Sequence, residues 1–570
     1  MYIDTRKLDD GTVIQSEICI IGAGAAGITL ARQFMATGMR VSMLESGGLR
    51  MERDTQQLYE GENVGLPYEL DTTRSRYFGG STNCWGGFSR PFEDYHFQTR
   101  DWVPESGWPI GPGDVEPYYG PAHEACGIES DYRPAPVLKG VAEQDLKPIA
   151  TSGGSRLQTS LTRLSKERRC FGKAYRSELD RATNVTVYLH ANAVELCTNA
   201  DGSTVESVLV RTLSGNRMRF RARWFVLATG AIENARLLLA SNGVEAGGVG
   251  NRYDQVGRYF MEHPRTVVAE VSLADGAEQA MKAYLPRYAL LRLPVAAEMN
   301  IGFDTQRHER LLDGAAYLEL VLQGEEAAST KAMKQLFWDL WRGVRPRQPM
   351  QQIGAVLSSP LSLATFGWGL LSCSERFVRC RRITFIAEQC PNPDSRVMLS
   401  RDMDPLGMPR VKLDWRTTDL DRETVRRTAE ILADELSGAG LLQIDKLLPN
   451  VEGDALTPTW NWHHMGTTRM HDDEKRGVVD ANCKVHGVGN LFVAGSSVFP
   501  TAGNHTPTLT IIALALRLAD HLCMQMARKP INLASRRTRP AGGTAPVPSA
   551  KAARESLLGN PPSGLRPASS

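Results

Sequence analysis

The sequence predicts a mixed α/β fold, in which a doubly wound α/β domain shares a large interface with a second domain. Length is the first observation, because 570 residues are too many for one compact core. Composition is the second, since 42% apolar and 23% charged residues are typical of a soluble globular protein. The third is a strand, a glycine-rich turn and a helix that follow one another near the N-terminus.

The first element is this strand–turn–helix unit. Residues 17–21 (EICII) form a short apolar run, residues 22–27 (GAGAAG) follow it, and a helical pattern occupies residues 28–37. A second strand is expected at residues 40–44, and it ends at Glu45. An acidic residue about 20 positions after the first glycine is typical of a dinucleotide-binding site.

The residues of the turn have separate roles in holding a pyrophosphate. Gly22 permits the tight turn, Gly24 lets backbone N–H groups approach the phosphates, and Gly27 allows the helix to pack closely on the strand. The helix N-terminus offers unpaired N–H groups to the phosphates. Glu45 is placed to accept hydrogen bonds from ribose hydroxyls, which disfavours the 2′-phosphate of NADP. The motif alone leaves FAD and NAD open.

Further strands and helices follow along the chain. Residues 61–127 are rich in Gly, Pro, Trp and Tyr, which is typical of a long ordered loop region around a cofactor. Strand-like runs with Asp-Gly and Ser-Gly turns occupy residues 185–229, and a helix is expected at 231–240. Residues 265–460 form a mixed second body, with helices expected at 329–341 and 417–437 and strands at 383–387, 396–399 and 410–415.

The C-terminal part returns to a strand, at residues 491–494, and to a helix, at residues 508–526. After Arg528 the composition shifts to Pro, Ala, Ser, Gly and Arg. Such a composition buries too little apolar surface to fold, so residues 528–570 are expected to be a disordered tail.

Charge and cysteine usage limit the partners and the compartment. The 66 basic and 64 acidic residues nearly cancel, so nucleic acid is not expected as the principal partner. The ten cysteines contain no CxxC pair, so no metal site is expected, and scattered thiols favour a reducing compartment. Residues 1–10 lack the apolar core of a secretory signal, so a cytoplasmic location is expected.

An uncharged stretch at residues 353–373 is about as long as a bilayer span and has arginines on both sides. Pro360, three glycines and several serines weaken it as a spanning helix. We expect a buried or lid segment, with contact to a membrane surface as the less favoured alternative.

Several segments together resemble the glucose–methanol–choline (GMC) oxidoreductase family, over nearly the whole chain to about residue 527. Segment 77–87 (YFGGSTNCWGG) resembles the GG-S/T loop beside the flavin, and segment 228–235 (ATGAIENA) resembles the second family signature. The most specific segments are 463–470 (HHMGTTRM), 480–487 (DANCKVHG) and 490–501 (NLFVAGSSVFPT), and 257–264 (GRYFMEHP) and 388–396 (EQCPNPDSR) are similar to bacterial members.

The resemblance implies an FAD-dependent oxidoreductase that removes a hydride from a CH–OH group of a sugar, a polyol or another small alcohol. It also implies a Rossmann-like FAD-binding domain made of discontinuous segments, and a substrate domain whose sheet covers the flavin ring. The electron acceptor is left open between oxygen, a quinone and a cytochrome, with a dehydrogenase favoured over an oxidase. The expected FAD-binding domain comprises residues 14–130, 181–264 and 474–527, and the substrate domain residues 131–180 and 265–473.

The same resemblance suggests the residues that hold the cofactor. Many family members attach FAD covalently through a histidine in the GG-S/T loop, but Cys84 occupies the matching place, so non-covalent FAD is expected. The expected cofactor-binding residues are Gly22, Gly24, Ala25, Ala26, Gly27, Glu45, Gly79, Gly80, Ser81, Asn83, Cys84, Val194, Ala228, Gly230, Gly495, Ser496 and Thr506.

Alcohol oxidation needs a general base for the hydroxyl proton, and imidazole suits this role near neutral pH. The family base lies in an H-x-x-G-T pattern, which puts it at His463, because Gly466 and Thr467 follow at the right offsets. His464 is then a neighbouring residue that is structural or shapes the pocket.

The family's second polar residue, a His or Asn, directly precedes a Pro-Thr-Leu-Thr run. Here the residue before that run is Thr506, with His505 and Asn504 one and two positions earlier. Either Thr506 supplies a hydroxyl, or a local backbone shift brings His505 or Asn504 into the site. His505 is favoured because imidazole both donates and accepts, and a structural loop histidine is the alternative.

Trp460, Asn461 and Trp462 precede the expected base and are candidate substrate-binding residues. Aromatic rings stack on the C–H faces of sugars and amides bond hydroxyls, although core packing explains two tryptophans equally well.

Two other functions are compatible with parts of the sequence. An NAD-dependent Rossmann dehydrogenase explains the glycine-rich turn and Glu45 but gives the His463 segment no role. A catalytically silent flavin-binding scaffold explains the departure at Thr506.

Overall fold

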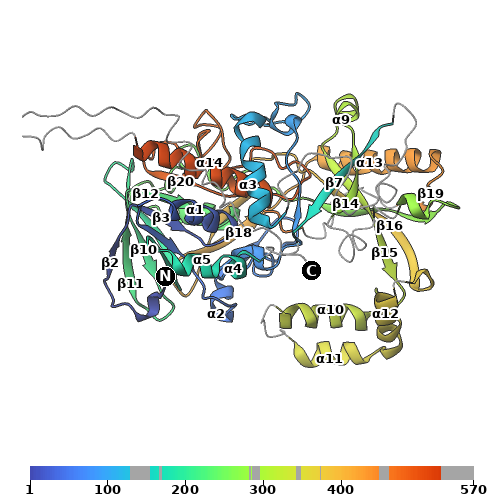
Figure 1. Ribbon diagram of the computed structural model, residues 1–570, viewed down its shortest axis with the longest axis horizontal. Coiled ribbons are helices and arrows are strands. Elements are labelled where there is room, and N and C mark those ends of the chain that lie inside the picture. Colours follow the sequence, from blue (N-terminus) through green and yellow to red (C-terminus); the bar gives the residue numbers. More distant parts are fainter. Residues whose placement is uncertain are drawn as a thin grey trace, which may run out of the picture. The chain divides into compact units, whose positions relative to one another are not determined.

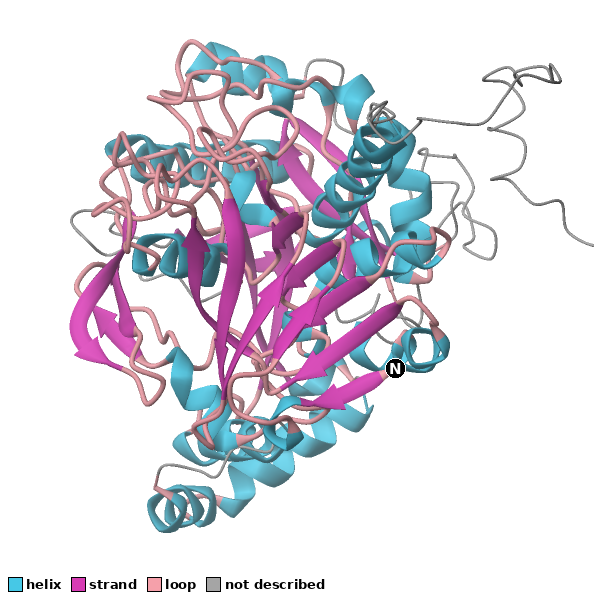
Figure 2. Ribbon diagram, turned by 90° about the vertical axis from the view of Figure 1, so that its left-hand side faces the viewer, coloured by secondary structure: helices cyan, strands magenta, loops and turns pink. Residues whose placement is uncertain are grey.

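A six-stranded parallel sheet carries the glycine-rich turn (Figures 1 and 2). The computed structural model describes residues 1–128, 155–165, 170–281, 284, 295–341, 348–372, 374–447 and 461–527. Contacts divide the chain into two compact units, Met1–Leu522 and Cys523–Ser570, and the first contains this sheet. Its strands run in the order β1 (Tyr2–Asp4), β8 (Val185–Leu189), β4 (Val41–Leu44), β3 (Ile18–Ile21), β12 (Trp224–Leu227) and β20 (Leu491–Val493).

Parallel strands need cover on both faces, and the sequence supplies it. All residues of β3, β4, β12 and β20 are buried. Helix α1 (Ala25–Met35) packs against β3 and β4 through a face of buried apolar residues. The other helices of this region are α2 (Arg53–Gln56), α3 (Glu116–Cys126), α4 (Phe171–Ala174), α5 (Arg176–Arg181), α6 (Ala231–Ala240) and α14 (Thr508–Ala527).

A seven-stranded antiparallel sheet forms a second body. Its order is β19 (Leu442–Leu447), β13 (Arg265–Leu273), β16 (Val378–Ala387), β15 (Gly314–Leu322), β14 (Val295–Ile301), β7 (Leu157–Leu164) and β6 (Phe88–Ser89). Helix α13 (Asp419–Gly438) contributes Val425, Ile431, Leu432 and Leu436 to one apolar core with these strands. Helices α7 (Glu278–Met281) and α9 (Phe303–Glu309) complete the described part of this body.

Two smaller sheets and a group of helices complete the first unit. One sheet has the order β2 (Val13–Gln15), β11 (Arg217–Arg221), β10 (Val205–Arg211) and β9 (Asn192–Thr198), and the other β17 (Arg396–Met403), β18 (Pro409–Asp414) and β5 (Gly61–Asn63). The helices α10 (Ala328–Trp341), α11 (Pro349–Leu357) and α12 (Pro360–Ser372) lie together beyond the end of β15 (Figure 1).

The α/β fold class is confirmed, and most expected elements form within a few residues of the expected bounds. The loop region 61–127 also contains helix α3, which sequence reasoning missed because Gly120 and Pro121 lie at its centre. The domain boundaries stay a prediction, although the parallel sheet does draw on strands far apart in the sequence. The expected tail, residues 528–570, and Trp460 lie outside the described residues.

The expectation of a buried segment at residues 353–373 is wrong for most of it. Among the nine residues of α11 none is buried, and in the described residues of α12 only Phe366 and Gly369 are. In contrast, α14 is long and apolar enough to cross a membrane by composition. However, 56% of its residues 508–525 are buried inside the protein, as is typical of a core helix.

Candidate active site

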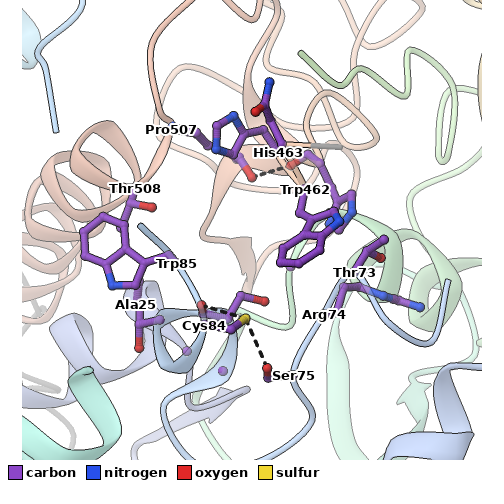
Figure 3. Close-up of a pocket in the computed structure, with 18 of the residues that line it drawn as sticks. Ala25, Thr73, Arg74, Ser75, Cys84, Trp85, Trp462, His463, Pro507 and Thr508 are labelled. Atoms are coloured by element: carbon purple, nitrogen blue, oxygen red, sulfur yellow. Dashed lines mark hydrogen bonds between the residues drawn. The ribbon is translucent and has the colours of Figure 1, made fainter. Parts of the chain in front are cut away.

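A cavity of about 820 Å³ lies between the parallel sheet and the seven-stranded sheet. Its walls come from the turn after β3, the loop after β12, the strands β14 to β16 and the segment 461–464. Figure 3 shows Trp85 on one side of this space and the adjacent Trp462 and His463 on another. A volume of this size suits a large organic ligand.

The glycine-rich turn at one end of the cavity is as tight as the sequence predicts. Gly22 has a φ of +109°, and a Cβ there would lie 2.4 Å from the carbonyl oxygen of Ala228. A Cβ on Gly27 would lie 1.9 Å from the carbonyl oxygen of Gly22. Helix α1 therefore begins directly against β3, and Gly24, Ala25 and the neighbouring Ala26 line the cavity.

Glu45 closes this end of the cavity at the tip of β4. Its Oε1 accepts the backbone N–H of Gly47 at 2.8 Å and its Oε2 that of Ala23 at 3.2 Å. The side chain is buried yet lines the cavity. Burial raises the pKa of Glu45, and the hydrogen bonds from Gly47 and Ala23 oppose this rise. The carboxylate keeps lone pairs for a ribose hydroxyl.

The GG-S/T loop lies against the same turn. Gly79 and Gly80 have φ values of +101° and +53°, and a Cβ on Gly80 would lie 2.9 Å from Cα of Gly24. Gly80, Ser81 and Cys84 line the cavity, whereas Gly79 lies behind them. The amide of Asn83 donates to the carbonyl of Phe78 at 3.0 Å, so it holds the loop's shape and does not line the cavity.

The remaining expected cofactor residues divide into two groups. Ala228, Gly230, Gly495 and Ser496 line the cavity, as expected. Val194 does not line the cavity, and its role in binding the cofactor stays a prediction. Side chains alternate along a strand, so in β9 it is Ala193 that lines the cavity while Val194 is buried on the other face.

His463 contacts a second histidine that the sequence analysis had not singled out. Nδ1 of His463 lies 2.8 Å from Nδ1 of His263, and Nε2 of His263 lies 3.4 Å from the carbonyl oxygen of Ala502. A carbonyl only accepts, so His263 carries its proton on Nε2 and accepts the Nδ1–H of His463. The unprotonated nitrogen of His463 is then Nε2.

Burial, with His263 and His464 nearby, holds the pKa of His463 well below its ordinary value. Burial and the Arg74 charge likewise lower the pKa of His464 to about 3. Both imidazoles are therefore neutral at neutral pH.

Glu262 fixes the backbone beneath these histidines. Its Oε1 accepts the N–H groups of His263 at 2.8 Å and His463 at 2.7 Å, and its Oε2 accepts the Tyr68 hydroxyl at 2.8 Å. Tyr68 in turn lies 2.6 Å from Nε2 of His464. Burial raises the pKa of Glu262 to about 7, against the effect of these hydrogen bonds.

Asn461 and Trp462 line the cavity beside His463, as predicted. Nδ2 of Asn461 donates to the carbonyl of His263 at 3.0 Å, and this hydrogen bond joins segment 461–464 to the residues just before β13. Trp462 has a φ of +61°, which is uncommon for a bulky residue and marks a locally strained backbone. Trp85, which the sequence analysis did not select, also lines the cavity.

Thr506, and not the favoured His505, lines the cavity near His463. The Thr506 hydroxyl donates to the carbonyl of Phe88 at 2.7 Å, so its oxygen is left as an acceptor. His505 is buried among aromatic rings, with its own ring 4.8 Å from that of His96. Asn504 is also buried and does not line the cavity.

His505, His96 and Asp313 offer nitrogen and oxygen atoms within 4.8 Å of one another. However, the backbone N–H of Glu93 donates to Nδ1 of His96 at 2.9 Å, so the proton of His96 lies on Nε2. That proton is donated to Asp313 at 2.8 Å, and the pair is a hydrogen bond rather than two free metal ligands.

Comparisons with known proteins support the family resemblance that the sequence suggested. A model of the GMC oxidoreductase family matches residues 391–515. The paromamine 6′-oxidase of Streptomyces fradiae is 25% identical, over 90% of this chain and 92% of its own length. The 2-methyl-1,2-propanediol dehydrogenase of Mycolicibacterium austroafricanum is 23% identical, over 94% of this chain and 99% of its own. These matches support the resemblance of this chain to GMC oxidoreductases, over most of its length at 23–25% identity and through the family model in residues 391–515.

Solved structures of this fold agree. A formate oxidase of Aspergillus oryzae RIB40, studied for its FAD modification, superposes with a TM-score of 0.53 at 18% identity, over 91% of this chain and all of that one. The pyridoxine 4-oxidase of Mesorbium loti has a TM-score of 0.54 at 16% identity, over 89% of this chain and 99% of its own. These solved structures show that the fold is shared, and the glycine turn, Glu45 and the cavity suit a dinucleotide such as FAD.

Two residues of the candidate site escaped sequence reasoning although a signal for them existed. Glu262 and His263 lie in the GRYFMEHP segment, which resembles bacterial GMC proteins. An adjacent acid and histidine before a proline, at the entry to a strand, could have been proposed as partners of the base. Their contact with His463 joins residues 200 positions apart, which no local pattern indicates.

Proposed function

We propose that this enzyme oxidises a CH–OH group of a small polyhydroxylated molecule, a sugar or a polyol, with His463 as the general base. The observation that carries the proposal is the unprotonated Nε2 of His463 in a cavity that also contains the dinucleotide turn. A neutral imidazole within reach of a hydroxyl is the requirement for removing its proton.

Bound FAD supplies the hydride acceptor. The N-terminus of α1 and the loop at Gly80 and Ser81 are placed to hold the phosphates, with Glu45 at the ribose. Ser496 and Gly495 line the cavity from the C-terminal part of the chain. His463 and Thr506 come from the same C-terminal part, so cofactor and substrate groups are positioned together.

His463 removes the proton of the substrate hydroxyl with Nε2 and becomes an imidazolium. Its Nδ1–H already donates to His263, which stabilises the positive charge as it forms. The carboxylate of Glu262 accepts the backbone N–H of His463 and so holds this residue in place. Thr506 offers its oxygen as an acceptor to a neighbouring hydroxyl of the substrate.

The aromatic and polar mixture of the cavity favours a polyhydroxylated substrate. Trp85 and Trp462 supply ring faces for C–H groups, and Glu298 and Glu319 line the part of the cavity formed by β14 and β15. The relatives named for paromamine and for 2-methyl-1,2-propanediol are consistent with this class.

We further propose that the FAD is held without a covalent bond. Cys84 stands where covalently attached members have a histidine, and its Sγ lies 3.3 Å from Oγ of Ser75 (Figure 3). The thiol is thus part of the loop's hydrogen bonding. Acid precipitation of the purified enzyme is expected to release all yellow colour to the supernatant, and colour retained in the pellet would contradict this.

The test of the function is anaerobic flavin reduction. The visible spectrum of the purified enzyme is recorded before and after sugars, polyols and simple alcohols are added in turn, and a hydroxylated substrate is expected to bleach the flavin bands. His463→Ala is expected to slow this bleaching at least 10³-fold, while His308→Ala, at an exposed position of α9, leaves the rate unchanged. Bleaching that is equally fast in His463→Ala would contradict the role of the base. A flavin that none of these compounds bleaches would instead favour a silent scaffold.

A further inference from the structure

Helices α11 and α12 form an apolar hairpin, residues 349–372, that the proposed reaction does not use. Among the described residues, eight of the seventeen exposed large apolar side chains lie between positions 337 and 371. Five of them on the hairpin are more than 60% exposed: Met350, Leu357, Leu361, Trp368 and Leu371. Soluble proteins rarely expose apolar side chains in such a concentration unless another surface covers them.

The exposed face is not the one that attaches the hairpin to the protein. α12 packs through Phe366 and Gly369, and a Cβ on Gly369 would lie 2.8 Å from Cβ of Phe377. Lys334 of α10 covers the Phe366 ring from 4.8 Å. Leu361 and Trp368 are seven positions apart, so they share another face of α12, which is left open.

The geometry excludes one straight bilayer span and suits a segment that lies in a membrane surface. The two helices are bent by 80° at their junction, so neither continues the other across a bilayer. Each is also too short to span alone, at 9 and 13 residues. Helices of this kind bury one apolar face at the boundary between headgroups and acyl chains.

Charge distinguishes a lipid surface from other apolar partners. Residues 348–373 contain no charged side chain, and the flanking segments 328–347 and 374–382 together contain nine basic and two acidic residues. Three of the nine, Lys334, Arg379 and Arg382, form ion pairs with Glu325 or Glu326, so the other six carry the basic excess. The whole chain, in contrast, is nearly neutral at +2. Basic residues next to an apolar segment are attracted to anionic headgroups, at about 1 kcal/mol each near the surface. Trp368 adds an aromatic ring of the type that favours the interface.

We propose that the α11–α12 hairpin docks this enzyme on the surface of a bilayer that contains anionic lipids. The hairpin packs on the end of β15, and Leu320, Val321, Glu325 and Glu326 at that end line the cavity. Docking therefore brings this end of the cavity close to the lipid surface.

Vesicle flotation tests the proposal without any substrate. The purified holoenzyme is mixed with vesicles of phosphatidylcholine alone or with about one third phosphatidylglycerol, and floated through a density gradient at low and at high salt. The enzyme is expected to float with the anionic vesicles, less so at high salt. Leu361→Glu/Leu371→Glu is expected to lower the floated fraction at least tenfold, and the control Met403→Glu, exposed on β17, leaves it unchanged.

Brominated lipids give a second readout that needs no disruptive variant. Their acyl chains are expected to quench part of the tryptophan fluorescence of the wild-type enzyme, and Trp368→Phe is expected to lose most of that quenching. An enzyme that floats with no vesicle, or a double variant that floats like the wild type, would overturn the proposal. A dimer that the double variant dissociates, without vesicle binding, would assign the hairpin to contact between two copies. None of these readouts depends on alcohol oxidation.

Discussion

His463 and the nearby Glu262 change their ionisation in different pH ranges. The imidazole is neutral far below neutral pH, because burial lowers its pKa, whereas Glu262 titrates near pH 7, because burial raises its pKa. A pH dependence of the reaction near neutrality therefore belongs to Glu262 and not to the base. Protonation of Glu262 removes one acceptor from beneath His263, His463 and Tyr68.

Glu262→Gln is expected to slow flavin reduction about 10- to 100-fold, because the amide presents a donor to groups that themselves donate. In the wild type the rate is expected to rise through pH 7 as Glu262 ionises, and in Glu262→Gln this rise is expected to disappear. Anaerobic stopped-flow spectra between pH 5.5 and 9 measure both. A rise that persists unchanged in the variant would assign the titration to another group.

Thr506→Val tests which residue of the 504–506 loop faces the substrate. The valine keeps the shape but removes the hydroxyl oxygen that lines the cavity, so flavin reduction is expected to slow about tenfold, or about 1.4 kcal/mol. His505→Leu replaces a ring buried behind the cavity and is expected to change the rate less than threefold. A larger loss in His505→Leu than in Thr506→Val would reverse this placement.

The contact between α1 and the turn before it controls the cofactor end of the cavity. A Cβ on Gly27 would overlap the carbonyl of Gly22, so the helix would have to move away from β3. Gly38, after the same helix, has no atom within 4 Å of a Cβ position and serves as the matched control.

Gly27→Ala is expected to purify with less than a tenth of the wild-type flavin content, because the displaced helix moves its N–H groups from the phosphates. Gly38→Ala is expected to retain full flavin content. The absorbance ratio of flavin to protein in the purified samples measures this. Equal flavin content in both variants would show that the close contact is not needed for binding.

Sequence reasoning was most accurate where one local pattern decides the element. The helix at 231–240 was predicted to the residue, and α1, α13 and α14 within three residues, since each has a clear apolar period. The segment 353–373 shows the limit. Its apolar composition is typical of a core helix, and only the tertiary structure reveals that no other element of the described chain buries this apolar face.

The cofactor end of the site was predictable because its residues are close in sequence and each has a backbone role. The partners of His463 were not, since Glu262 and His263 reach it across 200 positions. The choice between Thr506 and His505 depended on a side-chain direction in a loop, which spacing does not fix. Spacing also did not show that the side chain of Ala193, and not that of Val194, lines the cavity, because one position along a strand reverses the face.

At the scale of the whole molecule, buried ion pairs tie distant segments together at the active site. Arg100 makes two hydrogen bonds, of 2.7 and 2.6 Å, with Glu388 at the end of β16, and both are fully buried. Glu388 also accepts the N–H of Gly503 at 3.2 Å, next to the loop that carries Thr506. Burial opposes its ionisation, but the Arg100 charge outweighs this and holds the pKa of Glu388 at about 2.

The acid sensitivity of the fold is expected to come from buried histidines. A buried histidine whose pKa is lowered on folding contributes stability at pH values above its unfolded pKa of about 6.5. This stability is lost as the pH falls from there through its pKa in the folded state. Four carboxyl groups whose pKa values are raised by burial, Glu45, Glu262, Glu298 and Asp421, act in the opposite direction, but the histidines outnumber them. The buried histidines with a lowered pKa are His123, His190, His263 and His505, and the half-buried His463 and His464 share this direction.

The melting temperature of the holoenzyme is therefore expected to fall between pH 6.5 and 4. His123, on α3 and outside the cavity lining, has a pKa lowered to about 4 by burial and the Arg163 charge. His123→Leu is expected to make this fall shallower without changing the flavin content. Differential scanning calorimetry at several pH values measures the slope, and parallel curves for variant and wild type would contradict the assignment.

The order of strands in the parallel sheet has a consequence for synthesis on the ribosome. Strand β12 pairs with β3 on one side and with β20 on the other, so β20 forms an edge of the sheet. The first 490 residues leave the exit tunnel before that edge strand exists, so the nascent chain carries an open sheet edge for most of its translation. Cofactor capture is thus a late event, and a premature stop before Leu491 yields a chain with the glycine turn but without the strand and helix that complete its cavity.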